Sequence, residues 1–136
     1  MTAGKLTLTV VTPERSVVDR VVCDEVTFPS ERGELGILPS HTPLIALLAV
    51  GVVTWKGAAA HGAVAVRGGF AEVAGDVVRL LADEAVTREG VDVDAASRDK
   101  AAAEVRRATV SSAAELDTVN AEAAYAEARL VLASLR

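Results

Sequence analysis

The 136-residue chain is poor in the residues on which many binding sites depend. Aromatic residues make up 3% of it, with one Trp, one Tyr and two Phe, so no base-stacking surface is expected. The net charge is −5 and no segment is rich in Lys and Arg, which argues against nucleic acid as a partner. The single cysteine, Cys23, excludes an internal disulfide and a cysteine-based metal cluster. It lies in an apolar strand pattern and is predicted to be a small buried side chain.

The chain also has no long apolar segment and no leader-like start. The longest apolar run, Leu44–Val53, is about half of the ~20 residues that a membrane-spanning helix needs. Residues 1–6 lack the charged leader and apolar block of a signal peptide. We therefore expect a soluble cytoplasmic protein, or one that is attached to a membrane only through its partners.

Catalytic motifs are missing as well. The two histidines, His41 and His61, do not form a zinc-binding pair, and there is no nucleophile elbow or Walker-type loop. Gly68 and Gly69 are followed by another strand pattern rather than by a helix, so a β-turn or bulge is favoured over a dinucleotide loop. An enzyme is the least favoured class, and we expect no catalytic residue, metal or cofactor.

Residues from Lys5 to about Ala85 have the pattern of β-strands. In residues 6–11, alternating positions carry Leu or Val and β-branched residues, which is a period-two signal. Further strands are predicted at Val17–Val22, Glu25–Pro29, Leu44–Ala49, Val52–Lys56, Ala63–Arg67, Phe70–Ala74 and Val77–Leu81. Many short strands separated by turn residues are typical of a sandwich or a barrel.

From about Asp92 the chain becomes rich in Ala, Glu and Arg, which favour helices. A break near residues 109–111 predicts two helices, and Ser112 with Glu115 has the spacing of a capping box for the second. The short connection predicts that the helices fold back as an antiparallel hairpin. We therefore predict two domains, a β domain in residues 1–86 and a helical hairpin in residues 87–136.

The second predicted helix carries two apolar stripes on nearly opposite faces. One consists of Leu116, Val119, Ala123, Ala126, Leu130 and Ala133, and the other of Ala121, Tyr125, Ala128, Leu132 and Leu135. One stripe can pack on the first helix, and the other can pack on the β domain or on another subunit. The alternative is an Ala-rich helix that is merely apolar all round.

The segment from Pro29 to Leu44 is unusual because it is rich in Pro and Gly. These residues predict a stiff backbone that is neither helix nor regular sheet. Its apolar side chains are accompanied by two polar tips, Glu34 and His41. Such a loop suits protein recognition, although a simple connection at a sheet edge explains it equally well on physical grounds.

Three runs carry a resemblance to a known family. Residues 33–44 (GELGILPSHTPL) closely resemble the signature loop of F-type ATP synthase epsilon subunits. Residues 66–73 (VRGGFAEV) resemble the family's second signature, and residues 77–85 (VVRLLADEA) its closing strand. The resemblance covers essentially the whole chain. It implies an N-terminal antiparallel β-sandwich followed by a C-terminal two-helix antiparallel hairpin.

The resemblance also implies a function. It makes the chain a non-catalytic rotor subunit of the central stalk of a proton-translocating ATP synthase, which binds the gamma subunit and sits on the c ring. By resemblance, Glu34 and His41 face the c ring at the cytoplasmic face of the bacterial inner membrane. The hairpin would extend toward the catalytic α/β subunits and inhibit ATP hydrolysis. Its expected contacts there are basic: Arg98, Lys100, Arg106, Arg107 and Arg129.

The chain departs from the family at one point. Some relatives bind ATP on the folded hairpin through an Ile/Leu-Asp-x-x-Arg-Ala motif. Here residues 91–96 place Ala95 in the Arg position, and a shift by two residues places Ser97 there. Neither supplies a guanidinium for a phosphate, so no nucleotide is expected. The alternative to a rotor subunit is a free-standing β-sandwich adaptor with a helical tail that binds a partner.

Overall fold

The computed structural model of the protein describes residues 4–58 and 61–135. The strands in these residues are β1 (Leu6–Val11), β2 (Ser16–Cys23), β3 (Glu25–Ser30), β4 (Gly33–Ile37), β5 (Leu44–Leu47), β6 (Gly51–Lys56), β7 (His61–Ala74) and β8 (Val77–Thr87). They are followed by a short 3-10 helix, η1 (Arg88–Gly90), and by the helices α1 (Val93–Arg107) and α2 (Ala113–Ser134). The order of strands and then helices is the predicted one.

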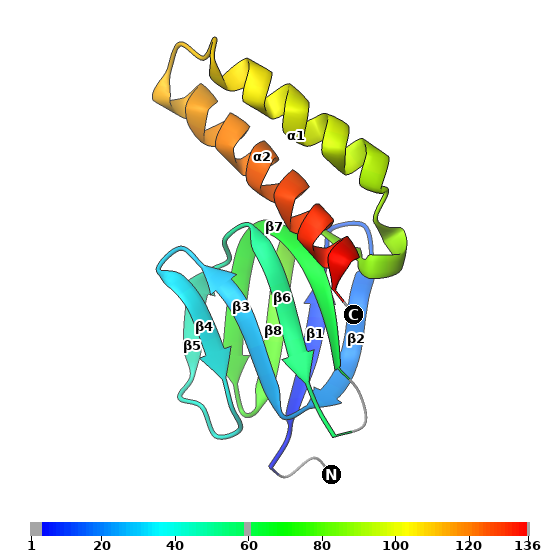
Figure 1. Cartoon of the computed structure of the whole chain (residues 1–136). Coiled ribbons are helices and arrows are strands. Elements are labelled where there is room, and N and C mark those ends of the chain that lie inside the picture. The colour runs from blue at the N-terminus through cyan, green and yellow to red at the C-terminus, as the bar shows by residue number, and fades with distance from the viewer. Residues whose placement is uncertain (1–3, 59–60, 136) are drawn as a thin grey trace.

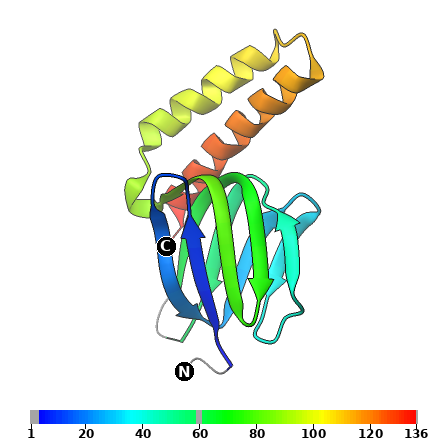
Figure 2. The same ribbon diagram turned by 180° about the vertical axis from the view of Figure 1, so that it is seen from behind.

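The strands form the predicted β-sandwich. The hydrogen-bonded order is β2-β1-β8-β7-β6-β3-β4, with β5 also paired to β7. The β1–β8 pair is parallel, and the other pairs are antiparallel. The first half of β7 pairs with β6 and its second half with β5, so β7 belongs to both layers. Figure 1 shows β4, β3 and β6 in front, and Figure 2 shows β2, β1, β8 and β5 from the other side.

The core between the layers is apolar and comes entirely from the sandwich. Its largest fully buried side chains include Phe28, Leu6, Leu8, Ile37 and Leu80. Cys23 is buried in the same cluster, as the strand pattern predicted. Alternate residues of β1 are buried, which is the expected result for a strand with one face toward the core.

The prediction of a turn or bulge at the two consecutive glycines is wrong. Gly68 and Gly69 lie inside β7, which continues past them, and the pairing with β8 keeps its register from Arg67 to Gly69. Their φ angles are +64° and +118°, which glycine adopts without the cost paid by other residues. A Cβ at Gly69 would overlap the carbonyl oxygen of Leu81. The glycines therefore let one long strand bend between the layers, where two strands were predicted.

The prediction that the Pro/Gly-rich segment avoids regular sheet is wrong for its first part. Residues 33–37 form β4, which pairs with β3 from Ser30 opposite Gly33 to Val26 opposite Ile37. Gly33, the first residue of β4, has a φ angle of +111°. At the other end of the strand, Ile37 is buried in the core. Only residues 38–43 form an irregular connection before β5.

Both helices of the hairpin begin where the sequence signals placed them. Asp92 caps α1, since its side chain accepts a hydrogen bond of 3.0 Å from the amide of Ala95. Ser112 caps α2 by accepting one of 3.1 Å from the amide of Glu115. The Glu115 carboxylate completes the cap one residue earlier than in a standard capping box, because it accepts from the amide of Ser111 at 3.1 Å.

The two apolar stripes of α2 pack on different surfaces, as predicted. Tyr125, Ala128 and Leu132 form one buried cluster with Ala65 of β7. Val119 and Ala126, which lie outside that cluster, are buried, as are Ala96 and Ala103 of α1; these small residues allow the two helices to pack closely. In Figure 1 only the C-terminal end of α2 lies on the sandwich, and the connection between the helices points away from it.

Candidate functional site

Glu34 and His41 lie at opposite ends of β4. Glu34 is exposed and sits next to the β3–β4 turn, opposite Pro29 in the register. His41 lies in the connection after β4, where its amide donates to the carbonyl oxygen of Leu38 at 3.2 Å. Its Nδ1 lies 2.6 Å from the carbonyl oxygen of Thr42, which fits an Nδ1–H donor. The two polar tips are thus presented separately and not as a pair.

A hollow of about 600 Å³ lies beside this loop, between the β4 and β5 edges. His41 lines it together with Leu35, Ile45 and Phe70, and the β3–β4 turn contributes Glu31 and Arg32, but Glu34 is absent from its lining. The sequence pointed to Glu34 and not to Glu31 or Arg32. Only the folding of β4 against β3 brings the turn and His41 to one hollow.

A row of exposed apolar side chains crosses β5, β7 and β8. Figure 2 shows the backbone of the layer that contains these strands. Leu47 of β5 pairs with Phe70 of β7, which pairs with Leu81 of β8. These side chains are 44%, 54% and 46% exposed, and the nearby Ile45 is 75% exposed. We call Ile45, Leu47, Phe70 and Leu81 the outer apolar row. Sequence reasoning missed it, although β8 offered a signal, because its Leu80–Leu81 pair is apolar on both faces of the strand.

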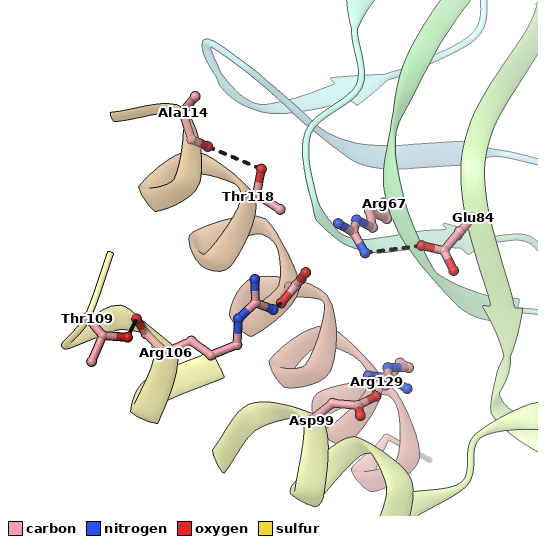
Figure 3. A network of polar contacts seen from close by, with 9 residues as sticks. Arg67, Glu84, Asp99, Arg106, Thr109, Ala114, Thr118 and Arg129 are labelled. Atoms are coloured by element: carbon pink, nitrogen blue, oxygen red, sulfur yellow. Dashed lines mark hydrogen bonds and ion pairs between the residues drawn. The ribbon is translucent and has the colours of Figure 1, made fainter. Parts of the chain in front are cut away.

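Four of the five predicted basic contacts of the hairpin are occupied by bonds between α1 and α2. Lys100 pairs with Glu127 at 2.8 Å and Arg106 with Glu122 at 2.5 Å. The Nε atom of Arg107 donates to the side-chain oxygen of Asn120 at 3.1 Å. The fourth, Arg129, reaches back from α2 to Asp99 at 2.8 Å. For Arg98, residues 4–58 and 61–135 contain no side-chain hydrogen bond or ion pair. Figure 3 shows Arg106 and Arg129 between the helices.

Arg129 also contacts Tyr125, which belongs to the cluster that packs on the sandwich. Its side chain is 17% exposed, its guanidinium lies 4.9 Å from the centre of the Tyr125 ring, and its Nε donates to the Tyr125 carbonyl oxygen at 3.4 Å. Burial raises the pKa of Tyr125, and the nearby Glu84 carboxylate adds to the rise. The hydrogen bond and the charge of Glu127 raise the pKa of Lys100, which favours the charged form of the Lys100 ammonium group.

The residues considered for nucleotide binding have other roles or no suitable group. The Asp92 carboxylate is used as the cap of α1, and Ala95 has only its amide engaged there. Among the described residues, no group of His, Cys, Asp and Glu side chains could hold a metal ion. In the same part of the chain, neither α1 nor α2 combines the length and the apolar character that crossing a bilayer requires.

These surfaces define a class: a small β-sandwich protein with exposed features that suit contacts with other proteins. Residues 5–88 match the family model described as the β-sandwich domain of the ATP synthase delta/epsilon chain. The ATP synthase epsilon chain of Solibacter usitatus is 43% identical, covering 94% of this chain and 95% of the relative. That of Symbiobacterium thermophilum is 39% identical, covering 93% and 90%. The chain therefore belongs to the ATP synthase epsilon-chain family, as its motifs indicated.

Solved structures agree with this fold over nearly the whole chain. A chain in the mitochondrial ATP synthase of Euglena gracilis, in a structure of OSCP, F1 and the c ring, matches with a TM-score of 0.78. It is 21% identical, and the match covers 98% of this chain and 82% of that one. A chain in the central stalk and c ring of Tetrahymena thermophila ATP synthase matches with a TM-score of 0.65 and 13% identity, covering 96% and 97%. The hairpin as well as the sandwich is thus a shared feature of the fold.

Proposed function

We propose that this chain is a non-catalytic rotor subunit of a proton-translocating ATP synthase, which links the gamma subunit to the c ring. We further propose that its hairpin restrains ATP hydrolysis. The outer apolar row is the observation that carries this proposal. Exposed apolar side chains on the face of a small sandwich favour burial by a permanent partner. The membership in the epsilon-chain family and the likeness to chains of central-stalk assemblies support it.

The outer apolar row is the proposed contact with the gamma subunit. Ile45, Leu47, Phe70 and Leu81 are all at least 44% exposed, and contiguous apolar side chains on a sheet face favour burial against another protein. Burying two large side chains contributes roughly 3 kcal/mol or more to binding. The variant Phe70→Glu/Ile45→Glu should therefore weaken binding to gamma at least ~100-fold.

The matched control for that variant is Val105→Glu, because Val105 is 71% exposed on α1, away from the row. Calorimetry with purified gamma should give wild-type affinity for this control. Both variants should keep the thermal stability of the isolated subunit. Undiminished binding by Phe70→Glu/Ile45→Glu would mean that the row is not the gamma contact, and would favour the alternative of an adaptor for a different assembly.

The proposed contacts with the c ring are Glu34 and His41. Both are accessible polar groups on or beside an edge strand, and neither takes part in the buried core. His41→Ala should change the stability of the isolated subunit by less than about 0.5 kcal/mol, as expected for a surface site. In the assembled enzyme it should lower the number of protons pumped per ATP hydrolysed. The variant Glu34→Gln tests the proposed c-ring contact at the other end of β4. A stability loss of several kcal/mol would make His41 a packing residue instead.

The hairpin is the proposed inhibitory element, through its helix surfaces and not through chemistry. The isolated subunit should have no ATPase activity and need no cofactor. ATP hydrolysis by the assembled complex should rise several-fold when residues 88–136 are deleted, while gamma remains bound. Equal hydrolysis with and without those residues would remove the inhibitory role and leave the linking role intact. Attachment through the c ring would place the subunit at the cytoplasmic face of the bacterial inner membrane.

A further inference from the structure

A hollow of about 490 Å³ lies where the β6–β7 hairpin, η1 and the end of α2 meet. No residue proposed above as a contact with gamma, the c ring or the catalytic subunits lines it. Among the described residues that do, Lys56, His61 and Arg88 are basic, and none is Asp or Glu. Because the chain as a whole has a net charge of −5, this local excess of basic groups runs against its composition. It favours an anionic ligand.

The pairing of β6 with β7 gathers the polar side chains of the hollow on one face. Lys56 lies opposite His61, and Thr54 lies opposite Ala63. Since alternate residues of a strand share a face, these four residues point to the same side of the sheet. Ala63 packs against the cluster that α2 forms with the sandwich, as does Leu135. The hollow therefore opens on the face that the end of α2 covers.

Arg88 closes the hollow from η1, of which it is the first residue. Within residues 4–58 and 61–135, its side chain forms no ion pair or hydrogen bond, and its Nε atom is buried without an acceptor. A buried N–H group without an acceptor is unfavourable. A ligand that brings oxygen atoms into the hollow would therefore supply what the guanidinium lacks.

Two carboxylates line a second hollow, of about 380 Å³, which Arg88 also borders. They are Asp19 and Glu89, and neither pairs with Arg88 in the described part of the chain. The Asp19 carboxylate instead lies 3.4 Å from Nε of Arg20. The Lys56 ammonium group likewise forms no ion pair among the described residues. The charges of Lys56 and Arg88 are thus not neutralised by contact with a carboxylate of those residues.

Trp55 forms a fixed apolar wall of the hollow. It is the only Trp of the chain, and it packs against the main core. Its partner in the register is Gly62, where a Cβ would lie 2.2 Å from Cζ2 of the ring. Glycine at this position therefore lets the ring lie close to the backbone of β7. The same ring is a built-in reporter of any ligand in the hollow.

We propose that this hollow binds a small oxyanion of the phosphate type. Arg88 donates to two of its oxygens, since a guanidinium matches that geometry, and Lys56 adds a second positive charge. His61 donates through a ring N–H, which either tautomer provides. Because Nε of Arg88 is buried, the ligand meets the terminal nitrogens first, and a turn of the side chain adds Nε. Residues 91–96, compared above with a nucleotide motif, do not line this site.

The test is an NMR titration of the ¹⁵N-labelled full chain with sodium phosphate, at constant ionic strength and with sodium chloride as the reference. Saturable shifts should be confined to the indole N–H of Trp55 and to amides around the hollow, such as those of Gly57 and Gly62. A few charge-assisted hydrogen bonds at an open site should give a Kd of roughly 1 mM. Shifts no larger than those in chloride, or shifts spread over the whole surface, would overturn the proposal.

The variants Arg88→Gln and Lys56→Gln separate this site from general charge. Arg88→Gln should weaken phosphate binding at least ~10-fold, and Lys56→Gln about 3- to 10-fold. Lys56 is exposed, so its replacement keeps the fold even if a change at Arg88 disturbs η1. The matched control is Arg32→Gln, in the β3–β4 turn, whose side chain has no ion pair or hydrogen bond among the described residues. The control should bind within about twofold of the wild type.

Equal phosphate affinity in all three variants would overturn the site. A second titration, with glycerol 3-phosphate, identifies the source of the phosphate group. Binding at least as tight as that of inorganic phosphate would support a phosphate ester as the ligand, and weaker binding would support the free ion. The outcome does not depend on the proposed rotor function, because the isolated chain is the sample.

Discussion

The amide of Ser40 donates a hydrogen bond of 2.6 Å to Oδ1 of Asp76, which lies 36 positions later in the chain. Both residues have positive φ angles, +69° and +61°. The carbonyl oxygen of Asp76 also accepts from the amide of Thr7 at 2.9 Å. One aspartate in the β7–β8 turn therefore ties the loop that carries His41 to strand β1.

Replacing Asp76 should loosen that loop. Asp76→Ala removes a charge-assisted acceptor and a residue that tolerates positive φ, so we expect a loss of about 1–2 kcal/mol in urea unfolding. Asp76→Asn keeps an acceptor and the same backbone preference, and should lose about half as much. Hydrogen exchange at Ser40 and His41 should accelerate in the same order. Equal effects of the two variants would contradict a role for the side-chain acceptor.

Gly69 should be the least replaceable glycine of the sandwich. Gly69→Ala forces a Cβ onto the Leu81 carbonyl at a φ of +118°, and we expect a loss of about 3 kcal/mol or more in thermal or urea unfolding. Gly36→Ala is the matched control, because a Cβ at Gly36 would meet no atom within 4 Å beyond its two chain neighbours. The control should be neutral or stabilising by up to ~1 kcal/mol, as alanine usually is in a strand. Similar losses in both variants would contradict the close approach of β7 to β8.

We predict that residues 1–86 fold without the hairpin. The main core cluster lies wholly within the sandwich, and the contact with α2 adds only a small cluster around Ala65. The fragment should unfold in one cooperative urea transition, at a lower midpoint than the full chain, because losing α2 exposes Ala65 and Val86. It should also still bind gamma. A broad, non-cooperative transition would show that the hairpin completes the domain.

Docking of the hairpin should weaken at alkaline pH. The pKa of Tyr125 is raised by burial and by Glu84, against the opposing effects of Arg129 and Arg67. The docked state thus favours the neutral phenol. Its contribution is complete below the unfolded pKa of about 10 and is lost as the pH rises through the folded value.

Because the chain has one tyrosine, phenolate absorbance reports this group alone. It should appear at higher pH in the folded chain than in urea, and Tyr125→Phe should remove the part of the alkaline destabilisation that belongs to docking. Titration of Tyr125 at the same pH in folded and unfolded chains would contradict its burial at the hairpin contact.

Local patterns in the sequence predicted most of the fold. Period-two alternation placed β1, β2, β3, β5 and β6 to within a few residues, because the alternation records which face of a strand is buried. It also placed the start of β8, but it ended that strand at Leu81 instead of Thr87. Ser112 and Glu115 marked the start of α2, since a cap is made by neighbours in the chain. The stripes of α2 were readable for the same reason, and the structure shows which surface each one covers. The family motifs in residues 33–44 and 66–73 were likewise local.

The tertiary structure decided the features that depend on pairing between distant segments. The sequence predicted a turn or bulge at Gly68 and Gly69. The structure has a bend within β7 there, because the pairing of β7 with β8 keeps one register across both glycines. Residues 33–37 read as a loop, and become β4 because β3 offers its open edge to them. The outer apolar row exists only because register aligns Leu47, Phe70 and Leu81 across three strands. The sequence predicted that the basic side chains of the hairpin contact a partner. Only the packing of α1 against α2 brings carboxylates of the same chain within reach of them. Composition and periodicity describe one segment at a time, whereas these contacts arise from how segments meet.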